Sequence, residues 1–403
     1  MTTSAYSATD GASRRRNAEI QGQGQGQSQS LSNGNVRHIP GEPKNLSKAI
    51  TKARPRESRS WIRRFKHRAV KHTWLVPLIL ILAFLSLYAL NPTEGNIIHR
   101  FIFLSYAQPA TETGVVQYGK GIWDVAFVFF YTIVLSFTRE FIMQEILSPF
   151  ARLCGIRSQR KQARFMEQMY SAIYFGCTGV AGLYVMSRTP VWYFRTTGMY
   201  EGFPHRTHEA AFKFYYLFEA AYWAQQALVM VLGLEERRKD FKELVAHHIV
   251  TLALIGLSYR FHFTYIGVAI YTTHDISDFF LAISKSFHYT GSELVIPFYA
   301  LNVVAWIYLR HYLNLRVLYS LLTEFRTVGP YELNWETEQY KCWISNIITF
   351  ALLAMLQSLN LFWLYCLGRS SWKFLSTGEK KDDRSDDSEP EENAQLQSNG
   401  PKQ

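Results

Sequence analysis

Cysteine is scarce in this sequence of 403 residues. The four that are present, Cys154, Cys177, Cys342 and Cys366, are far apart, form no C-x-x-C pair and do not cluster with histidine. This spacing indicates neither a zinc knuckle nor a disulfide framework. The sequence predicts four buried free thiols instead.

The N-terminus also lacks an apolar stretch. It opens MTTSAYSATDGASRRR, and the first hydrophobic run begins only at Trp74. A secretory leader carries its apolar segment within about the first 30 residues. We therefore expect no cleaved signal peptide.

Three long stretches lack charged residues altogether. They are 74–90, 169–187 and 345–367, with 17, 19 and 23 residues. The mean hydropathy of the chain is -0.09, a value that alone would suggest a large soluble protein. That average is lowered by polar ends at 1–72 and 372–403, the first of which contains the low-complexity segment QGQGQGQSQS. Uncharged runs of this length predict membrane spans.

Eight apolar stretches are long enough to be considered as spans. A soluble core helix is the competing interpretation for any one of them, but it does not account for eight together. The predicted fold class is an all-α polytopic membrane protein with about eight transmembrane helices. The expected spans are 74–90, 122–138, 169–187, 212–234, 244–259, 262–284, 294–309 and 345–367.

The distribution of basic residues predicts the orientation of these spans. Residues 1–72 hold 15 Lys and Arg against 4 Asp and Glu, which places the N-terminus in the cytosol. The basic segments RSQRKQARF and EERRKDFKE follow the second and fourth spans, on the same side, and an even number of spans returns the C-terminus there. Four regions are expected: a disordered cytosolic segment 1–72, a first helix with its luminal loop 73–119, a membrane domain 120–368 and a disordered cytosolic tail 369–403.

The tail is strongly acidic, with 8 acidic and 3 basic residues between Glu379 and Glu392. One interpretation is a solvated disordered tail. The other is regulation, because Ser388 stands in an S-x-x-E context that suits an acid-directed kinase.

Two histidines and two aspartates interrupt the fifth and sixth spans: His247, His248, Asp275 and Asp278. A tight hairpin around Arg260 joins these spans. At about 1.5 Å per helical residue, the four groups lie roughly 20–27 Å from that turn, at one level near the cytosolic side. Ionisable groups at membrane depth are costly, so they mark a functional site unless they form a structural polar clamp between two helices.

Imidazole is suited to proton transfer near neutral pH, and a nearby aspartate can stabilise its charged form. Because His247 and His248 point about 100° apart on one helix, we expect one to be the base or nucleophile and the other a binding or orienting group. A metal site is the rival chemistry. It has weak support, since only His274 and Asp278 stand at i,i+4 and no H-x-x-H-H box is present.

The fourth span contains FYYLFEAAYWAQQ, which places Glu219 in mid-span beside Tyr222 and Trp223. Aromatic residues at helical spacing are usually packing residues. A lone acid at this depth needs a partner or a cavity, so Glu219 is a candidate substrate-binding residue.

The stretch HHIVTLALIGLSYRFHFTYIGVAIYTTHDISDFFLAISKSFHY resembles the signature of the longevity-assurance family, the ceramide synthases, whose membrane region is the TLC domain. The double histidine, the D-x-x-D and the following Ser-Lys all agree, as do FYYLFEAAYW, WIYLRHYLN and LQSLNLFW. The resemblance covers roughly 120–368, and the basic N-terminus and acidic tail are similar to fungal members. His288 departs from the asparagine that is common there, and the homeobox-like insert of many animal members is missing.

The resemblance implies N-acylation of a sphingoid base by a long or very-long-chain fatty acyl-CoA in the endoplasmic reticulum membrane. It implies six or seven helices arranged as a barrel around an intramembrane cavity. His247 would be the acyl-accepting or proton-abstracting residue, with His248, Asp275 and Asp278 completing the site. Tyr222, Trp223, His274 and Lys285 would contact substrate with Glu219. The cytosolic Arg157, Arg160 and Lys161 could attract the phosphates of CoA; the alternative is a basic loop that serves topology alone.

The expected partners are acyl-CoA, the sphingoid base, membrane lipid and either a second or paralogous copy or a small single-span regulatory subunit. Acyl-CoA is a co-substrate, and no other cofactor, metal or nucleic acid is expected. Two other functions stay open: a TLC-domain lipid sensor without enzymatic activity, and a transporter. Two mechanisms also stay open, namely direct attack of the amine on the thioester and a two-step route through an acyl-histidine.

Overall fold

The computed structural model describes residues 68, 72–109, 114–235 and 237–377, all within one compact unit, Ser58–Gln403. This part of the chain is almost entirely helical, with one small pair of strands. The elements are α2 (Leu75–Leu90), α3 (His99–Ile102), β1 (Gln117–Tyr118), α4 (Trp123–Phe141), η1 (Ile142–Leu147), α5 (Ser148–Leu153), α6 (Gln159–Ser187), η2 (Trp192–Phe194), η3 (Thr197–Met199), β2 (His208–Glu209), α7 (Ala210–Leu232), α8 (Phe241–Arg260), α9 (Thr264–Thr290), α10 (Val295–Ala305), η4 (Trp306–Leu313), α11 (Asn314–Thr327) and α12 (Trp343–Thr377).

Each of the eight expected apolar runs lies on a helix. Two of these helices end at a glycine in the left-handed region, Gly233 after α7 and Gly291 after α9, with φ of 62° and 69°. Glycine tolerates this conformation, which lets the chain turn back and close the last carbonyl groups. The last helix continues to Thr377, beyond the boundary expected at 368.

Among the described helices, four are both long and apolar enough to cross a membrane: Trp123–Leu153, Gln159–Ser187, Phe241–Arg260 and Trp343–Lys373. Leu75–Leu90 is apolar but shorter. The lower hydropathy of α7 and α9 has a local cause, because they carry Lys213, Glu219 and the Asp275–Asp278 pair. The chain is therefore a helical membrane protein.

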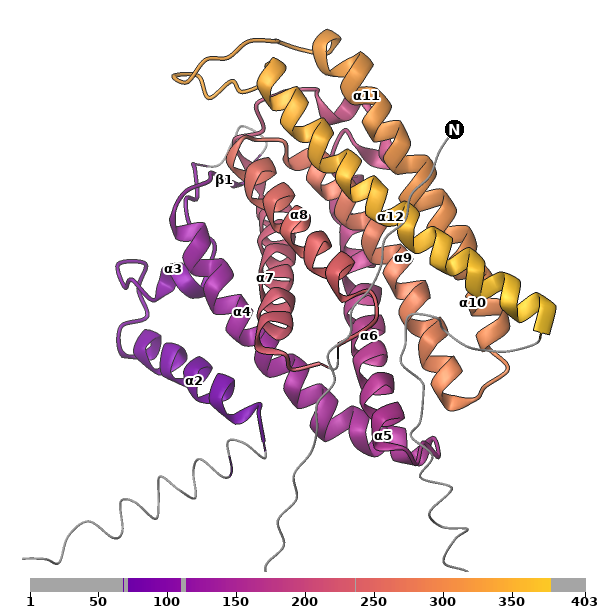
Figure 1. The fold of residues 1–403 in the computed structure, drawn as a ribbon. Helices are drawn as coiled ribbons and strands as arrows, with labels where there is room; N and C mark the ends of the chain where they lie inside the picture. The colour runs from indigo at the N-terminus through magenta and orange to yellow at the C-terminus, as the bar shows by residue number, and fades with distance from the viewer. Residues whose placement is uncertain (1–67, 69–71, 110–113, 236, 378–403) are drawn as a thin grey trace, which may run out of the picture. The chain divides into compact units, whose positions relative to one another are not determined.

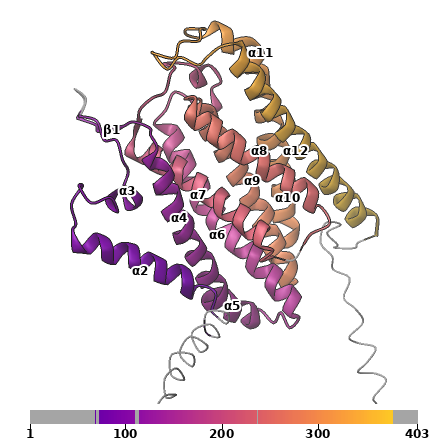
Figure 2. The same ribbon diagram turned by 60° about the vertical axis from the view of Figure 1, so that its left-hand side comes forward.

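Helices α6 and α9 pack side by side along most of their length (Figures 1 and 2). Glycines on α6 allow this approach. A Cβ atom at Gly182 would lie 2.7 Å from Thr272 Oγ1 of α9 and 2.6 Å from the Tyr215 hydroxyl of α7, closer than real side chains come. Small residues play this part in many membrane helix pairs.

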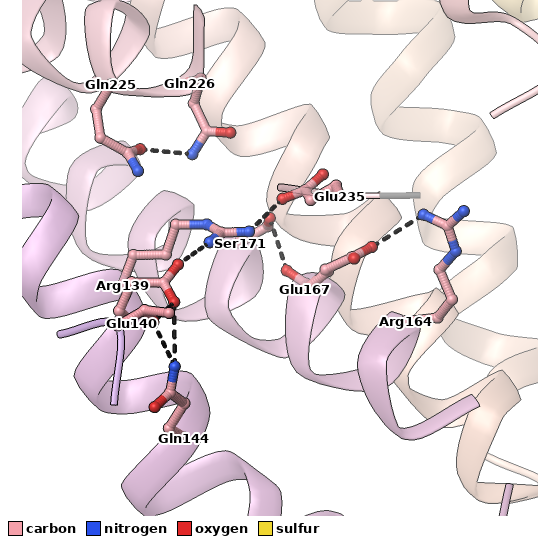
Figure 3. A network of polar contacts seen from close by, with 10 residues as sticks. Arg139, Glu140, Gln144, Arg164, Glu167, Ser171, Gln225, Gln226 and Glu235 are labelled. Carbon is pink, nitrogen blue, oxygen red and sulfur yellow. Dashed lines mark hydrogen bonds and ion pairs between the residues drawn. The ribbon is translucent and has the colours of Figure 1, made fainter. Parts of the chain in front are cut away.

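The connections between helices gather at two opposite ends. At the β1–β2 end, strand β1 pairs antiparallel with β2, and Lys120 donates a 2.7 Å hydrogen bond to the carbonyl oxygen of His205. At the other end, which we call the Arg139 end, Arg139 of α4 forms ion pairs with Glu140 and with Glu235, which follows α7 (Figure 3). Successive connections thus alternate between the ends.

Candidate active site

The two histidines of α8 are buried and differ in their surroundings. The His247 ring lies between two indoles, with centroid distances of 5.4 Å to Trp223 and 5.3 Å to Trp363. Its Nδ1 atom has no hydrogen-bond partner among the described residues. His248 instead donates from Nδ1 to the Leu244 carbonyl oxygen at 2.8 Å, which fixes its tautomer. Of the two rings, only that of His247 has an Nδ1 atom without a hydrogen-bond partner in the described part of the chain.

Asp275 is fully buried on α9, facing α7. The Tyr215 hydroxyl donates to its Oδ2 at 3.2 Å, whereas Oδ1 has no hydrogen-bond partner in the described part of the chain. A carboxylate oxygen without a donor is costly in a dry interior. Asp275 therefore has an oxygen available to accept a proton or a hydrogen bond from a ligand.

Asp278, one helical turn along α9, has a partner that the sequence did not predict. Its Oδ2 lies 2.6 Å from the Arg310 guanidinium. Arg310 is itself buried, and it also donates to Ser277 Oγ at 2.6 Å and to Asn360 Oδ1 at 3.2 Å. The site therefore contains a cation and an anion that neutralise each other, which lowers the cost of placing charged groups at membrane depth.

A π-helical segment holds Arg310 in this position. The seventh expected span ends at 309, but the helix continues without a break from α10 through η4 into α11, so Arg310 lies in mid-helix. The wider turn of η4 buries both Arg310 and His311. Such segments often occur at functional sites. The sequence did contain a signal for this residue, because Arg310 directly follows an apolar run. A span whose end is set by hydropathy alone stops before the arginine and so excludes it from the site.

Two cavities meet at His247, each with a volume of about 220 Å³. The first, the apolar cavity, runs between α8, α9 and α12 from His247 and Asp275 to Trp335 and Tyr340 at the β1–β2 end. The second, the polar cavity, runs from His247 and Arg310 toward the Arg139 end. Its lining includes Glu167, Ser171, Gln226, Glu235, Arg237, Arg238, His248 and Asp278, so it borders the network of Figure 3. Only Trp223 and His247 line both cavities.

Three further candidates lie beside these cavities. Tyr222 lines the polar cavity and stacks on Tyr174 at a centroid distance of 3.6 Å. His274 lines the apolar cavity and donates from Nδ1 to the Ile270 carbonyl oxygen at 2.9 Å. Glu219 is fully buried, accepts a 2.9 Å hydrogen bond from the Tyr174 hydroxyl and lines neither cavity.

The predicted basic residues lie elsewhere. Arg157, Arg160 and Lys161 are exposed at the start of α6 and line neither cavity. Lys285 is two helical turns from Asp278 along α9 and also lines neither. Ser388 lies outside the described residues.

Arg237 and Arg238 are the basic residues at the outer part of the polar cavity. Arg238 donates two hydrogen bonds to Asp240, at 2.9 Å and 2.8 Å, and Asp240 accepts a third at 3.0 Å from Trp363 Nε1. This chain of contacts connects Arg238 to one of the indoles that hold His247. The segment EERRKDFKE was recognised in the sequence, but only as a topology signal.

No three His, Cys, Asp or Glu side chains in the described part of the chain lie close enough together to hold a metal ion. The arrangement instead offers an imidazole nitrogen without a hydrogen-bond partner where the two cavities meet, a carboxylate oxygen beside the apolar cavity and a guanidinium beside the polar one. These groups are suited to acyl transfer.

Comparison with known proteins agrees with this chemistry. A protein-family model described as "TLC domain" matches residues 164–369. The chain is 50% identical over 374 residues to "Sphingosine N-acyltransferase-like protein FUM17" of Gibberella moniliformis, covering 87% of this chain and 96% of the relative. The chain belongs to the TLC-domain ceramide synthase family. The resemblance to the fungal longevity-assurance proteins is confirmed.

Other ceramide synthases of this family are nearly as similar. "Sphingosine N-acyltransferase lac1" of Schizosaccharomyces pombe is 46% identical over 344 residues, which is 84% of this chain and 88% of the relative. "Ceramide synthase LAG1" of Saccharomyces cerevisiae is 46% identical over 359 residues, with 88% and 86% coverage. These alignments extend beyond the TLC domain, since they cover more of the chain than residues 164–369.

Proposed function

We propose that this protein is a ceramide synthase that transfers the acyl group of a fatty acyl-CoA to the amine of a sphingoid base at His247. The observation that carries the proposal is the position of His247, whose ring lines both the apolar and the polar cavity. An acyl-CoA likewise has an apolar part and a polar part, because its acyl chain is apolar and its CoA moiety is a water-soluble polyanion. The thioester joins the two parts, and it would lie at the imidazole.

The cavities suggest how each substrate part is held. The apolar cavity, lined by residues of α8, α9 and α12, takes the acyl chain, and its far end lies at Trp335 and Tyr340. The polar cavity takes the pantetheine portion of CoA, with Arg237 and Arg238 available to its phosphates. This placement replaces Arg157, Arg160 and Lys161 as the nearest basic groups, and those three would act only at longer range.

The proposed chemistry has two steps. The His247 imidazole attacks the thioester carbonyl carbon, the carbon–sulfur bond breaks, and the CoA thiolate takes up the proton that the acylated ring releases. The neutral amine of the base then attacks the acyl-imidazole, an amide bond forms as the bond between the acyl group and the ring breaks, and the proton released by the amine passes to a nearby base, which returns it to the departing imidazole. Asp275 is suited to that last role because its Oδ1 lacks a donor. Arg310 is suited to stabilise the negative charge on the carbonyl oxygen.

The proposal includes eight membrane-crossing helices, the later ones enclosing the cavities as a barrel. The protein would lie in the membrane of the endoplasmic reticulum, with both termini in the cytosol. Two observations support this proposal. Successive connections alternate between the β1–β2 end and the Arg139 end, as an up-and-down arrangement requires. The Arg139 end also carries the basic segments that sequence rules assign to the cytosol. A dimer, a paralogous partner and a small single-span subunit stay predictions.

A reconstituted assay tests the function. Purified protein is given an acyl-CoA and a long-chain base, and free CoA and ceramide are both measured. A ceramide synthase releases CoA in a one-to-one ratio with ceramide. A lipid sensor or transporter binds or moves the substrates and releases no CoA, so intact acyl-CoA at the end of the assay would overturn the proposal.

A further inference from the structure

A third cavity lies away from His247 and is lined by residues of α4, α7 and α8. The three helices can be followed in Figures 1 and 2. We call this cavity the α4–α8 groove. Its volume is about 820 Å³, and it reaches the β1–β2 end. None of the site residues described above lines it.

Away from its rim, the α4–α8 groove has mainly apolar walls. Ile122 and Val125 of the α4 wall are 76% and 63% exposed, with Val128 deeper along the same helix. On the α8 wall, Gly256 leaves a gap, since a Cβ atom there would meet nothing within 4 Å. From Ile122 to Val128 the groove extends along about 9 Å of helix. This surface fits the upper part of a hydrocarbon chain.

The rim at the β1–β2 end carries two basic residues, Lys120 and Arg260, that form no contact ion pair with an acid of the described part of the chain. Among the described residues, no carboxylate oxygen lies within 4.0 Å of the Lys120 ammonium or the Arg260 guanidinium. Lys120 donates only to the His205 carbonyl oxygen and to His262 Nδ1, at 2.7 Å and 3.2 Å. Arg260 contacts the Tyr340 hydroxyl at 3.4 Å.

The two acids of the groove are already engaged. Asp124 forms a 2.7 Å ion pair with the buried Lys213 and accepts a 2.8 Å hydrogen bond from the Tyr259 hydroxyl. Glu338 lies 3.4 Å from Arg206 and 3.5 Å from His262. The rim therefore keeps an excess of positive charge.

The ionisation of the rim residues is set first by their burial. Burial lowers the pKa of Lys120 to about 7, and the charges of Asp124 and Glu338 oppose that shift. Burial, followed by the charges of Lys120, Arg206 and Arg260, lowers the pKa of His262 to about 3. A bound anion would favour the charged forms of both side chains, because an opposite charge nearby raises the pKa of a lysine or a histidine.

We propose that the α4–α8 groove binds an anionic glycerophospholipid, with its phosphate between Lys120 and Arg260 and one acyl chain between α4 and α8. Basic pockets between membrane helices recognise lipid head groups on the cytosolic side of membranes, and the α4–α8 groove would place the same chemistry at the opposite end of the helices. A free phosphate ion would leave the apolar walls unused. A packed helix of another protein would leave the two cations without a counter-charge.

Native mass spectrometry of the purified full-length protein tests this proposal. The protein is exchanged into nanodiscs that contain equal amounts of phosphatidic acid, phosphatidylcholine and diacylglycerol. The protein is then released from the nanodiscs in the mass spectrometer, and the molecules of each lipid that stay bound to it are counted. We expect phosphatidic acid to be retained at least tenfold over diacylglycerol. The Lys120→Gln/Arg260→Gln double variant should lose that preference, and Gly256→Leu should lower retention by filling the groove.

Arg195→Gln is the matched control, since Arg195 is an exposed arginine at the same end of the helices, outside the groove, and pairs with Glu201 at 2.5 Å. It should retain lipid as the unmodified protein does. Thermal unfolding and ceramide formation show that each variant is folded. Unchanged retention in the double variant would overturn the proposal. So would displacement of the lipid by inorganic phosphate alone, or a co-purified protein helix in place of lipid.

Discussion

The Arg310 guanidinium lies 2.6 Å from the Asp278 carboxylate, and in this membrane-crossing protein the arginine is buried and the aspartate half-buried. The pair faces the polar cavity that ends at His247. An aspartate that is already paired with a cation is a poor general base. We therefore propose that Asp278 positions Arg310. Asp275 would be the group that accepts the proton of the substrate amine.

Arg310→Ala should be destabilising, because it leaves the half-buried Asp278 without a counter-charge. Loss of one partner of a fully buried pair costs about 3–5 kcal/mol, and the partial exposure of Asp278 places the expected loss at or below the lower end of that range. Ceramide formation should fall by about 10² or more, as expected when a transition-state donor is removed. Thermal unfolding and kcat/KM are the two measurements.

Two further variants separate stability from catalysis in that experiment. The double variant Arg310→Ala/Asp278→Asn should recover much of the unfolding temperature but not the activity, whereas Arg316→Ala, which removes an exposed arginine of α11, should change neither. A double variant with full activity would show that Arg310 has only a structural role.

Gly182→Ala should impair the site without touching any reactive group. The added methyl group would lie 2.6 Å from the Tyr215 hydroxyl, so Tyr215 would have to move away from Asp275. We expect activity to fall about tenfold or more, with a lower unfolding temperature. Gly368→Ala is the control, because its methyl group would meet nothing within 4 Å. Equal activity of the two variants would argue against a role for the Tyr215–Asp275 contact.

The β1–β2 end should lose stability in acid. The pKa of His262 is lowered to about 3, chiefly by burial, and its Nδ1 accepts a hydrogen bond from Lys120. The unfolded chain binds a proton near pH 6.5, whereas the native protein does not, so stability is complete above pH 6.5 and decreases as the pH falls toward 3. The unfolding temperature measured from pH 7.5 to 4.5 should decrease. In His262→Gln, which cannot be protonated, the decrease should be smaller, and an identical pH profile would contradict this account.

Protease protection tests the proposed topology. Tags placed before Met1 and after Gln403 should both be cleaved in sealed microsomes, whereas a tag near Thr113 should be protected until detergent is added. Termini on opposite sides would mean that one of the eight helices does not cross the membrane. The short helix Leu75–Leu90 and the polar α7 and α9 would then be re-examined first.

Much of the fold could be predicted because it depends on chain-local properties. Apolar runs of sufficient length locate the helices, and the hairpin expected around Arg260 occurs between α8 and α9. The placement of His247 and His248 on one helix and of Asp275 and Asp278 on another follows from the same runs. These features need only hydropathy and helical geometry.

The partners of these residues could not be predicted in the same way. Arg310 reaches Asp278 only because η4 turns it inward, and a local change of helix type leaves no hydropathy signal. The two cavities depend on the packing of three or four helices at once, so the choice of Arg237 and Arg238 over Arg157 and Arg160 needs coordinates. Sequence spacing identifies candidate groups, whereas their ionic partners are set by tertiary packing.

The central claim is that the acyl group is transferred through His247, and intact-protein mass spectrometry tests it most directly. The purified protein is incubated with an acyl-CoA and no sphingoid base, and the peptide that carries any added mass is identified by fragmentation. The account predicts one acyl group on His247, absent from His247→Ala, and its conversion to ceramide when the base is added. Absence of any adduct, with free CoA released only when the base is present, would contradict it and would identify direct attack of the amine on the thioester as the mechanism.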